Sequence, residues 1–226
     1  MKSVSALPPS RMTRFSAVVL LSVLLCLGPA NAFDQLSQAQ SLIYDTSHLA
    51  NTHEGQQIDY RYESIDTGDA RLQDKTTLTV SKTLPEDRRD VEVNFLSAER
   101  HMALPPFQGY RGNPVIIAML EHIAQSMGSD TGGGALYFRN RIRDALADAE
   151  LTVEESEASY AGSQLNTRKL TFRPFMNDTF LGGDSSFYRN TEFSIRFSDQ
   201  VPAGVLAITV HAESDEALFH RQLSLE

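Results

Sequence analysis

The stretch NPVIIAMLEHIAQSMGSDTGGGALYFRNRIRDAL, residues 113–146, determines the fold because it places two helices between two runs of strand-like sequence. Asn113 followed by Pro114 is typical of a helix N-cap and a first helical residue. Apolar residues then recur at helical spacing as far as Gly128, which we expect to cap the helix C-terminus. A second amphipathic helix is predicted from about Ala135. The two apolar stripes consist of Ile116, Met119, Leu120, Ile123 and Met127, and of Phe138, Ile142, Ala145, Leu146 and Ala149.

On both sides of this helical pair, apolar and polar residues alternate, which is typical of antiparallel strands with one buried and one solvated face. A short helix over 34–46 comes first, and a loop rich in proline, glycine and aromatic residues is expected over 99–112. We therefore predict an α+β fold: a half-barrel-like antiparallel sheet of about eight strands, with a leading helix and two inserted helices on one face. The predicted strands cover residues 58–65, 71–80, 90–96, 151–157, 165–174, 192–197, 204–210 and 217–225.

Residues 1–32 have the three parts of a secretory signal peptide. Three basic residues come before an apolar run over 16–28, which is too short to span a bilayer, since a spanning helix needs about 20 residues. Ala30-Asn31-Ala32 then supplies small residues at a cleavage site. We expect cleavage after Ala32, so that the mature chain begins at Phe33 and is periplasmic or secreted.

Removal of 32 residues from 226 leaves 194, a length suited to a single α+β domain over 33–226. The one cysteine, Cys26, would leave with the signal peptide, so we expect no disulfide and no thiolate chemistry in the mature chain. Loss of three cations would lower the net charge from −9 to −12. Because such a chain is repelled by phosphates, we expect no nucleic-acid partner, and we predict no transmembrane segment after signal removal.

Two glycine-containing motifs suggest chemistry that their context does not support. A phosphate-binding loop needs a strand before its glycines, whereas a helix precedes Gly132-Gly133-Gly134. Asp66-Thr67-Gly68 and Asp130-Thr131-Gly132 resemble the paired turns of aspartic proteases, but a two-lobed protease is longer than this chain. We interpret Asp66 and Asp130 as turn residues whose carboxylates are exposed to water.

Histidine and serine motifs are also incomplete. In His53-Glu54-Gly55-Gln56-Gln57 a glutamine stands where a zinc-protease helix needs its second histidine. The pairs His48 with His53 and His211 with Glu213 have no third ligand at a suitable spacing. Gly183-Asp184-Ser185-Ser186-Phe187 lacks the closing glycine of a nucleophile elbow. We therefore predict no catalytic residue, no metal site and no cofactor.

Candidate ligand contacts come first from one helix face and one loop. Arg139 and Arg143 are four residues apart on a helix, a spacing that suits the clamping of a carboxylate or phosphate. The alternative is a solvated helix face offset by Asp144 and Asp148. Phe107 and Tyr110 lie in the long loop, where aromatic residues either form the mouth of a pocket or plug one end of the core.

The remaining candidates, Phe95, Phe193 and Ile195, belong to the apolar side of the predicted strands. The order of elements resembles the periplasmic lipoprotein carriers, an antiparallel half-barrel closed by helices, and also exported bacterial families of unknown function. This resemblance lies in architecture over residues 34–226 and in no motif. It implies a concave face that shelters acyl chains. Helices packed on the sheet would explain the same residues.

We expect an exported, non-enzymatic domain that binds an apolar or amphipathic ligand, such as a lipid or acylated molecule, or an envelope protein. Two alternatives stay open: a periplasmic hydrolase with a dispersed site around Arg139 and the histidines, and a structural envelope subunit. An apolar groove left open by the helices would favour the first function. Convergent His, Asp or Glu side chains in a cleft would favour the hydrolase, and a flat apolar patch the structural subunit.

Overall fold

The computed structural model describes residues 36–148 and 150–226, so the predicted signal peptide lies outside the described residues. The strands are β1 (Gln57–Asp66), β2 (Leu72–Thr83), β3 (Arg89–Phe95), β4 (Phe107–Tyr110), β5 (Val153–Tyr160), β6 (Ser163–Phe172), β7 (Glu192–Phe197), β8 (Val205–Glu213) and β9 (Leu218–Leu225). The helices are α1 (Gln38–Gln40), η1 (Ser41–Asp45), η2 (Ala98–Arg100), α2 (Pro114–Thr131), α3 (Ala135–Leu146), η3 (Gly183–Asn190) and η4 (Pro202–Gly204).

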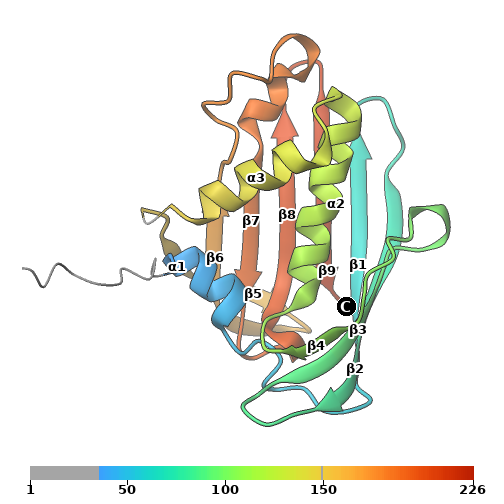
Figure 1. The fold of residues 1–226 in the computed structure, drawn as a ribbon, viewed down its shortest axis with the longest axis vertical. Helices are drawn as coiled ribbons and strands as arrows, with labels where there is room; N and C mark the ends of the chain where they lie inside the picture. Colours follow the sequence, from blue (N-terminus) through green and yellow to red (C-terminus); the bar gives the residue numbers. More distant parts are fainter. Residues whose placement is uncertain (1–35, 149) are drawn as a thin grey trace, which may run out of the picture. The chain divides into compact units, whose positions relative to one another are not determined.

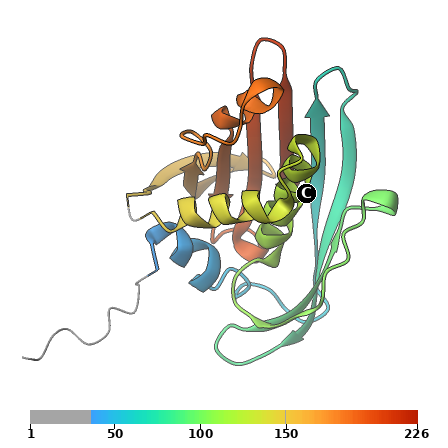
Figure 2. The same cartoon turned by 45° about the horizontal axis from the view of Figure 1, so that its top comes forward.

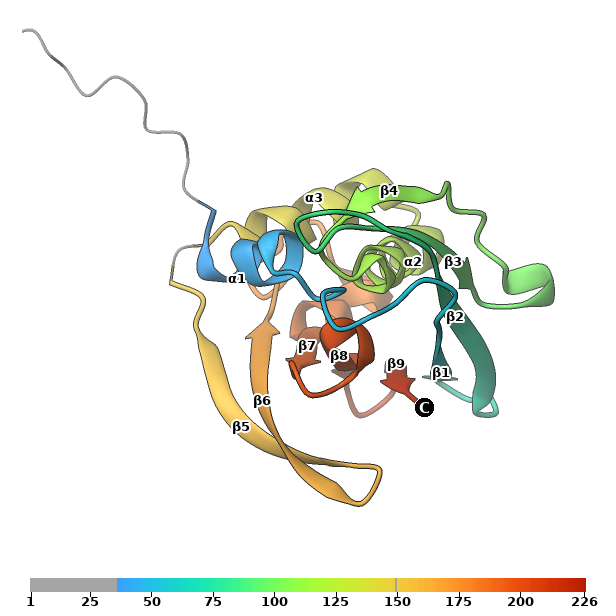
Figure 3. The same ribbon diagram turned by 90° about the horizontal axis from the view of Figure 1, so that it is seen from below.

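The nine strands form one open antiparallel sheet in the order β4-β3-β2-β1-β9-β8-β7-β6-β5 (Figure 1). Helices α2 and α3 lie on the same side of this sheet (Figures 1 and 2), and the sheet curves around α2 (Figure 3). The predicted α+β class, with a leading helix and two inserted helices, is therefore confirmed, with nine strands in place of about eight.

The topology consists of two meanders joined at one strand pair. Strands β1 to β4 form the first and β5 to β9 the second, and the antiparallel pairing of β1 with β9 connects them. Because β4 and β5 lie at opposite edges, α2 and α3 carry the chain across the sheet from one edge to the other. The helical pair thereby connects the two meanders along the chain and covers the apolar face of the sheet (Figure 1).

Strand β4 corrects the prediction of a continuous loop over 99–112. It pairs with β3 through Arg89 opposite Tyr110 and Val91 opposite Phe107. The strand has only four residues and follows two prolines, and proline is tolerated at a sheet edge because no partner there requires its N–H. A short edge strand of this kind has no long alternation by which it could be predicted.

The start of α2 is fixed by Asn113, as its sequence predicts. The Asn113 side chain accepts a hydrogen bond from the backbone N–H of Val115 at 2.9 Å, and Pro114 occupies the first helical turn. The Asn113 amide also donates to the Tyr60 hydroxyl and the Ala203 carbonyl, both at 2.9 Å. The N-cap thus ties α2 to β1 and to η4, and both donor positions of its buried side-chain amide are used.

The end of α2 differs from the prediction, because Gly128 does not cap the helix. The helix continues to Thr131, and Gly132, with a φ of 68°, is the left-handed C-cap. A Cβ on Gly128 would lie 2.6 Å from the backbone nitrogen of Ala135. Gly128 is therefore required by the close approach of α3 to α2, and the glycine triplet is the connection between the two helices, as expected.

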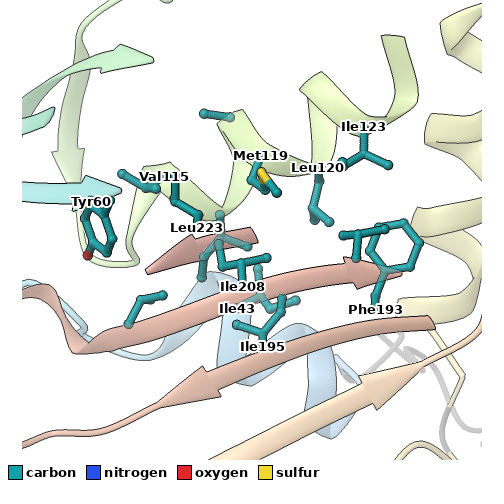
Figure 4. Close-up of a cluster of buried hydrophobic side chains, with 14 of the residues drawn as sticks. Ile43, Tyr60, Val115, Met119, Leu120, Ile123, Phe193, Ile195, Ile208 and Leu223 are labelled. Carbon is teal, nitrogen blue, oxygen red and sulfur yellow. The ribbon is translucent and has the colours of Figure 1, made fainter. Parts of the chain in front are cut away.

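The core lies between α2 and the sheet (Figure 4). Val115 and Met119 face Leu223 of β9 and Ile208 of β8, and all four side chains are fully buried. The leading helix begins with a capping box, in which the Ser37 hydroxyl accepts from the Gln40 N–H. The same hydroxyl donates to the carbonyl of Leu146, so the start of α1 is attached to the end of α3.

Candidate functional site

Three of the predicted contact residues, Phe95, Phe193 and Ile195, are completely buried in the core. Phe193 stacks on Phe172 with ring centroids 4.9 Å apart and also meets Phe175 at 6.3 Å. All three residues pack beneath the helices, and none lines either of the two pockets described below. The apolar face of the sheet is therefore covered by side chains at these positions.

Phe107 and Tyr110 lie at the two ends of edge strand β4, with ring centroids 5.4 Å apart. Both are partly buried against the core cluster. Burial raises the pKa of the Tyr110 hydroxyl. They line neither of the two pockets, and their packing corresponds to the core-plug interpretation.

Arg139 and Arg143 do converge, on an apolar groove of about 280 Å³ between η1, α2 and α3. We call it the α2–α3 groove. Its lining residues are Tyr44, Ile117, Leu120, Glu121, Arg139, Ile142 and Arg143. The spacing of four residues on α3 places both guanidinium groups beside the apolar side chains, as the helical period requires.

The two arginines of the α2–α3 groove differ in their ion pairs. Arg139 donates through Nε and Nη2 to both carboxylate oxygens of Glu121, at 2.7 and 2.6 Å. These hydrogen bonds lower the pKa of Glu121. Arg143 forms an ion pair with Asp144, at 3.1 Å, and both of these side chains are more than half exposed. The guanidinium group of Arg143 is therefore more available to a ligand than that of Arg139.

A second, larger pocket of about 600 Å³ lies on the other flank of α2. We call it the α2–β9 pocket. Four segments far apart in the sequence form its walls: the end of β1 with the following turn, one face of α2, η3 and the first half of β9. The lining residues are Asp66, Thr67, Asp69, His122, Gln125, Ser126, Ser129, Asp130, Phe187, Tyr188, Ala217, Leu218 and Arg221. The two Asp-Thr-Gly motifs thus meet at one pocket.

Asp66 is not a free turn carboxylate, contrary to the prediction. It is the last residue of β1, and Arg221 of β9 donates to its two oxygens at 2.8 and 2.9 Å. The Arg221 side chain is only 8% exposed, whereas that of Asp66 is 37% exposed. The guanidinium also lies 4.1 Å from the centre of the Phe219 ring, a cation–π distance.

Asp130 is also engaged, since the Tyr188 hydroxyl donates to its Oδ2 at 2.8 Å. Burial, followed by this hydrogen bond, raises the pKa of Tyr188 well above its usual value. The two aspartates therefore have different partners, Arg221 and Tyr188, and do not share a proton as a protease pair would.

His122 is joined to the Tyr62 hydroxyl by a hydrogen bond of 2.9 Å from its Nε2. Burial, and then the nearby positive charge of Arg221, lowers the pKa of His122 to about 4. Burial raises the pKa of Tyr62 to about 12. At neutral pH both side chains are uncharged, and Arg221 is the one cation among the lining residues of the α2–β9 pocket.

The histidines that the sequence singled out lie elsewhere. His48 is buried, bonds the Leu42 carbonyl at 2.6 Å and stacks on Phe197. His211 lies 3.4 Å from Glu213 on an exposed part of β8. Within residues 36–148 and 150–226, no group of three or more His, Cys, Asp or Glu side chains is arranged to hold a metal ion.

The residues of the α2–β9 pocket were not predicted, although α2 carries a signal for them. His122, Gln125, Ser126 and Ser129 recur at helical spacing on one side of the apolar stripe. A polar stripe of this kind is ordinarily solvated. The residues that complete the pocket, Arg221 and the aromatic residues of η3, lie in distant segments of the sequence, so the stripe alone did not indicate a pocket.

No family model, curated protein or solved structure matches this chain. In the part of the chain that the structure describes, no helix is both long enough and apolar enough to cross a membrane.

Proposed function

We propose that this chain is an exported, non-enzymatic domain that binds a small amphipathic anion in the α2–α3 groove. The observation that carries the proposal is the convergence of Arg139 and Arg143 on a groove whose other walls are largely apolar. An acyl tail gains about 0.8 kcal/mol for each methylene group that it buries. A carboxylate at the rim accepts charge-assisted hydrogen bonds from guanidinium groups.

The size of the groove limits the ligand to a short or medium-length chain. Its volume of about 280 Å³ lies just below the range of roughly 300–1,000 Å³ that is usual for small-molecule sites. Arg143 supplies the main positive charge for a ligand, because its ion pair with Asp144 is solvent-exposed and therefore weak. Arg139 is already bound to Glu121 by two hydrogen bonds. Glu121, Arg139 and Arg143 are the charged residues that line the groove, and their net charge is positive, which favours an anion; Asp144 pairs with Arg143 from outside the lining.

The α2–β9 pocket gathers His122, Asp66 and Asp130, which is the pattern that a hydrolase would need. Each of these three side chains is hydrogen-bonded to another side chain, and His122, which bonds the Tyr62 hydroxyl, is uncharged at neutral pH. These contacts favour a binding domain over the hydrolase.

Octanoate and octanol are the probes that test the proposal, because they share a tail and differ in charge. In methyl-labelled protein, octanoate should shift the resonances of Ile117, Leu120 and Ile142 and bind more tightly than octanol. The variant Arg139→Gln/Arg143→Gln should bind octanoate about three- to tenfold more weakly, since partly exposed ion pairs contribute up to about 1 kcal/mol each. Octanol binding should be unchanged.

A matched control removes the same charge elsewhere. Arg61 and Arg173 are exposed and pair with Glu226 and Glu192, so Arg61→Gln/Arg173→Gln also lowers the net charge by two. This variant should bind octanoate like the parent protein. The proposal fails if octanoate leaves the three methyl resonances unmoved, or if both double variants lose affinity equally.

A further inference from the structure

The α2–β9 pocket is built as a ligand site that is separate from the α2–α3 groove. Its volume of about 600 Å³ lies within the usual range for small-molecule sites, and it shares no lining residue with the groove. Next to it is a recess of about 320 Å³, and both are lined by Asp130, Phe187 and Tyr188. The two hollows together form an extended site on either side of an aromatic pair.

The charges of the α2–β9 pocket disfavour an anionic ligand. Three carboxylates, of Asp66, Asp69 and Asp130, line it, and the one lining cation, Arg221, already makes two hydrogen bonds with Asp66. A phosphate or carboxylate would therefore meet net negative charge and no free guanidinium.

A cationic ligand is only weakly favoured. Arg221 offsets the charge of Asp66, and Tyr188 donates to Asp130. The negative charge that Arg221 does not offset lies on Asp69 and Asp130, which are both exposed, so an ammonium group bound there would gain little from a solvated ion pair. Metal ions are disfavoured as well, because the described residues contain no cluster of suitable ligands.

The polar wall instead suits hydroxyl groups, which donate and accept together. The carboxylate oxygens of Asp66 and Asp130 keep lone pairs beyond the hydrogen bonds that they accept. Gln125 uses its amide N–H toward Glu121, which leaves its carbonyl oxygen as an acceptor. Ser129 lies on the same wall and can act either as donor or as acceptor.

The aromatic pair supplies the apolar part of the site. The rings of Phe187 and Tyr188 lie with centroids 4.1 Å apart, inclined at 31°. The Tyr188 hydroxyl is anchored on Asp130, and its ring packs edge-on against Phe219 at 5.3 Å. Tyr188 is thus buried and fixed beneath its neighbour, and Phe187, which is partly exposed at the boundary between the two hollows, is the ring on which the C–H face of a sugar can pack.

We infer that the α2–β9 pocket binds an uncharged carbohydrate, a short oligosaccharide whose hydroxyls bond the polar wall and whose ring carbons pack on Phe187, the partly exposed ring that the buried Tyr188 supports. The carboxylates of Asp66 and Asp130 accept from sugar hydroxyls, and Ser129 and bridging waters complete the contacts. The two hollows provide room for sugar units on both sides of the aromatic pair.

Saturation-transfer NMR on the whole protein tests this inference with three neutral trisaccharides: maltotriose, cellotriose and triacetylchitotriose. A sugar phosphate and the diamine putrescine serve as charged comparisons at the same concentration. At least one neutral trisaccharide should receive saturation at ~10 mM, a concentration that detects binding down to the millimolar range. Neither charged probe should compete with it.

Two variants locate the binding. Phe187→Ala should weaken the trisaccharide about tenfold, as the loss of an aromatic anchor does. Its matched control is Phe180→Ala, which removes an exposed ring that packs on Tyr137 outside the pocket and should change affinity less than about twofold. Ser129→Ala, which removes the hydroxyl with little change in volume and suits a helix, should also weaken binding while the melting temperature stays constant.

Three results would overturn the inference. The first is the absence of saturation transfer to every neutral trisaccharide. The second is equal affinity of the Phe187→Ala and Phe180→Ala variants. The third is tighter binding of putrescine or the sugar phosphate than of any neutral probe. Octanoate binding, which is read from methyl groups in the α2–α3 groove, is independent of all three.

Discussion

Replacement of Asp66 by Asn should destabilise the protein, although the sequence suggested a solvated turn carboxylate. The change removes the negative charge that faces Arg221 across β1 and β9, the strand pair that joins the two meanders. The Arg221 side chain is only 8% exposed. A guanidinium that has lost its carboxylate in such a position cannot regain full hydration.

The magnitude follows from the different exposure of the two partners. Breaking a fully buried ion pair costs about 3–5 kcal/mol, and a hydrogen bond to a charged group contributes about 1.5–3 kcal/mol. Asp66 is 37% exposed, and asparagine keeps one carbonyl acceptor for Arg221, so the lower values apply. We expect a loss of about 2 kcal/mol in the free energy of unfolding.

Urea unfolding followed by circular dichroism measures this loss. With a slope of about 2 kcal/mol per molar urea, the midpoint should fall by about 1 M while the slope stays constant. The control is Asp199→Asn, because Asp199 pairs with Arg168 at 2.9 Å but is 79% exposed. It should cost less than about 0.5 kcal/mol.

A double-mutant cycle with Arg221→Met separates the ion pair from other effects. The double variant should be less destabilised than the sum of the single variants, with a coupling energy of at least about 1 kcal/mol. Equal midpoints for Asp66→Asn and Asp199→Asn, or additive effects in the cycle, would show that the guanidinium of Arg221 is solvated and that this reasoning is wrong.

Four further predictions concern the glycines, His122, the core and export. Gly128→Ala places a methyl group 2.6 Å from a backbone nitrogen of α3 and should cost about 1–3 kcal/mol in thermal unfolding, whereas Gly133→Ala meets side-chain atoms of Phe180 and Thr131, which can move, and should cost less. His122 has a pKa of about 4 when folded and about 6.5 when unfolded, so its contribution is complete above pH 6.5 and is lost as the pH falls toward 4. His122→Gln should therefore flatten the loss of stability measured between these pH values. Phe193→Leu should lower the melting temperature and leave octanoate and trisaccharide affinity unchanged, because this residue lines neither pocket. N-terminal sequencing of protein from the cell envelope should begin at Phe33, and an intact Met1 would contradict export by signal cleavage.

The regular elements could be predicted because burial imposes a period on the sequence. In β1 the buried positions alternate from Ile58 onward, and in α2 Met119 and Ile123 face the sheet as the helical spacing indicates. Exceptions occur where tertiary contacts override a local signal. A glycine at position 128 suggests a helix end, but glycine is required there because the backbone of α3 lies too close for a Cβ atom. Strand β4 is too short to show a period.

The candidate sites were predictable only where a single helix supplies the residues. Arg139 and Arg143 share one face of α3, so their spacing was enough to group them. The contacts of the α2–β9 pocket are long-range: Asp66 and Arg221 are 155 residues apart, and Asp130 and Tyr188 are 58 apart. Local periodicity contains no information about such pairs, since they depend on the pairing of β1 with β9 and on the position of η3.

The two sites have a common structural origin in α2. An amphipathic helix ordinarily buries one stripe and exposes the rest to water. Here one face of α2 packs on the sheet, a second presents Ile117 and Leu120 to the α2–α3 groove, and a third presents His122, Gln125 and Ser129 to the α2–β9 pocket. The chemistry of each flank follows from what lies opposite: the arginine-bearing face of α3 on one side, and the carboxylates and rings of β1 and η3 on the other. Substitutions on one flank that leave the hydrogen bond from Gln125 to Glu121 intact should therefore change binding at that site alone, provided that the face on the sheet keeps α2 in place.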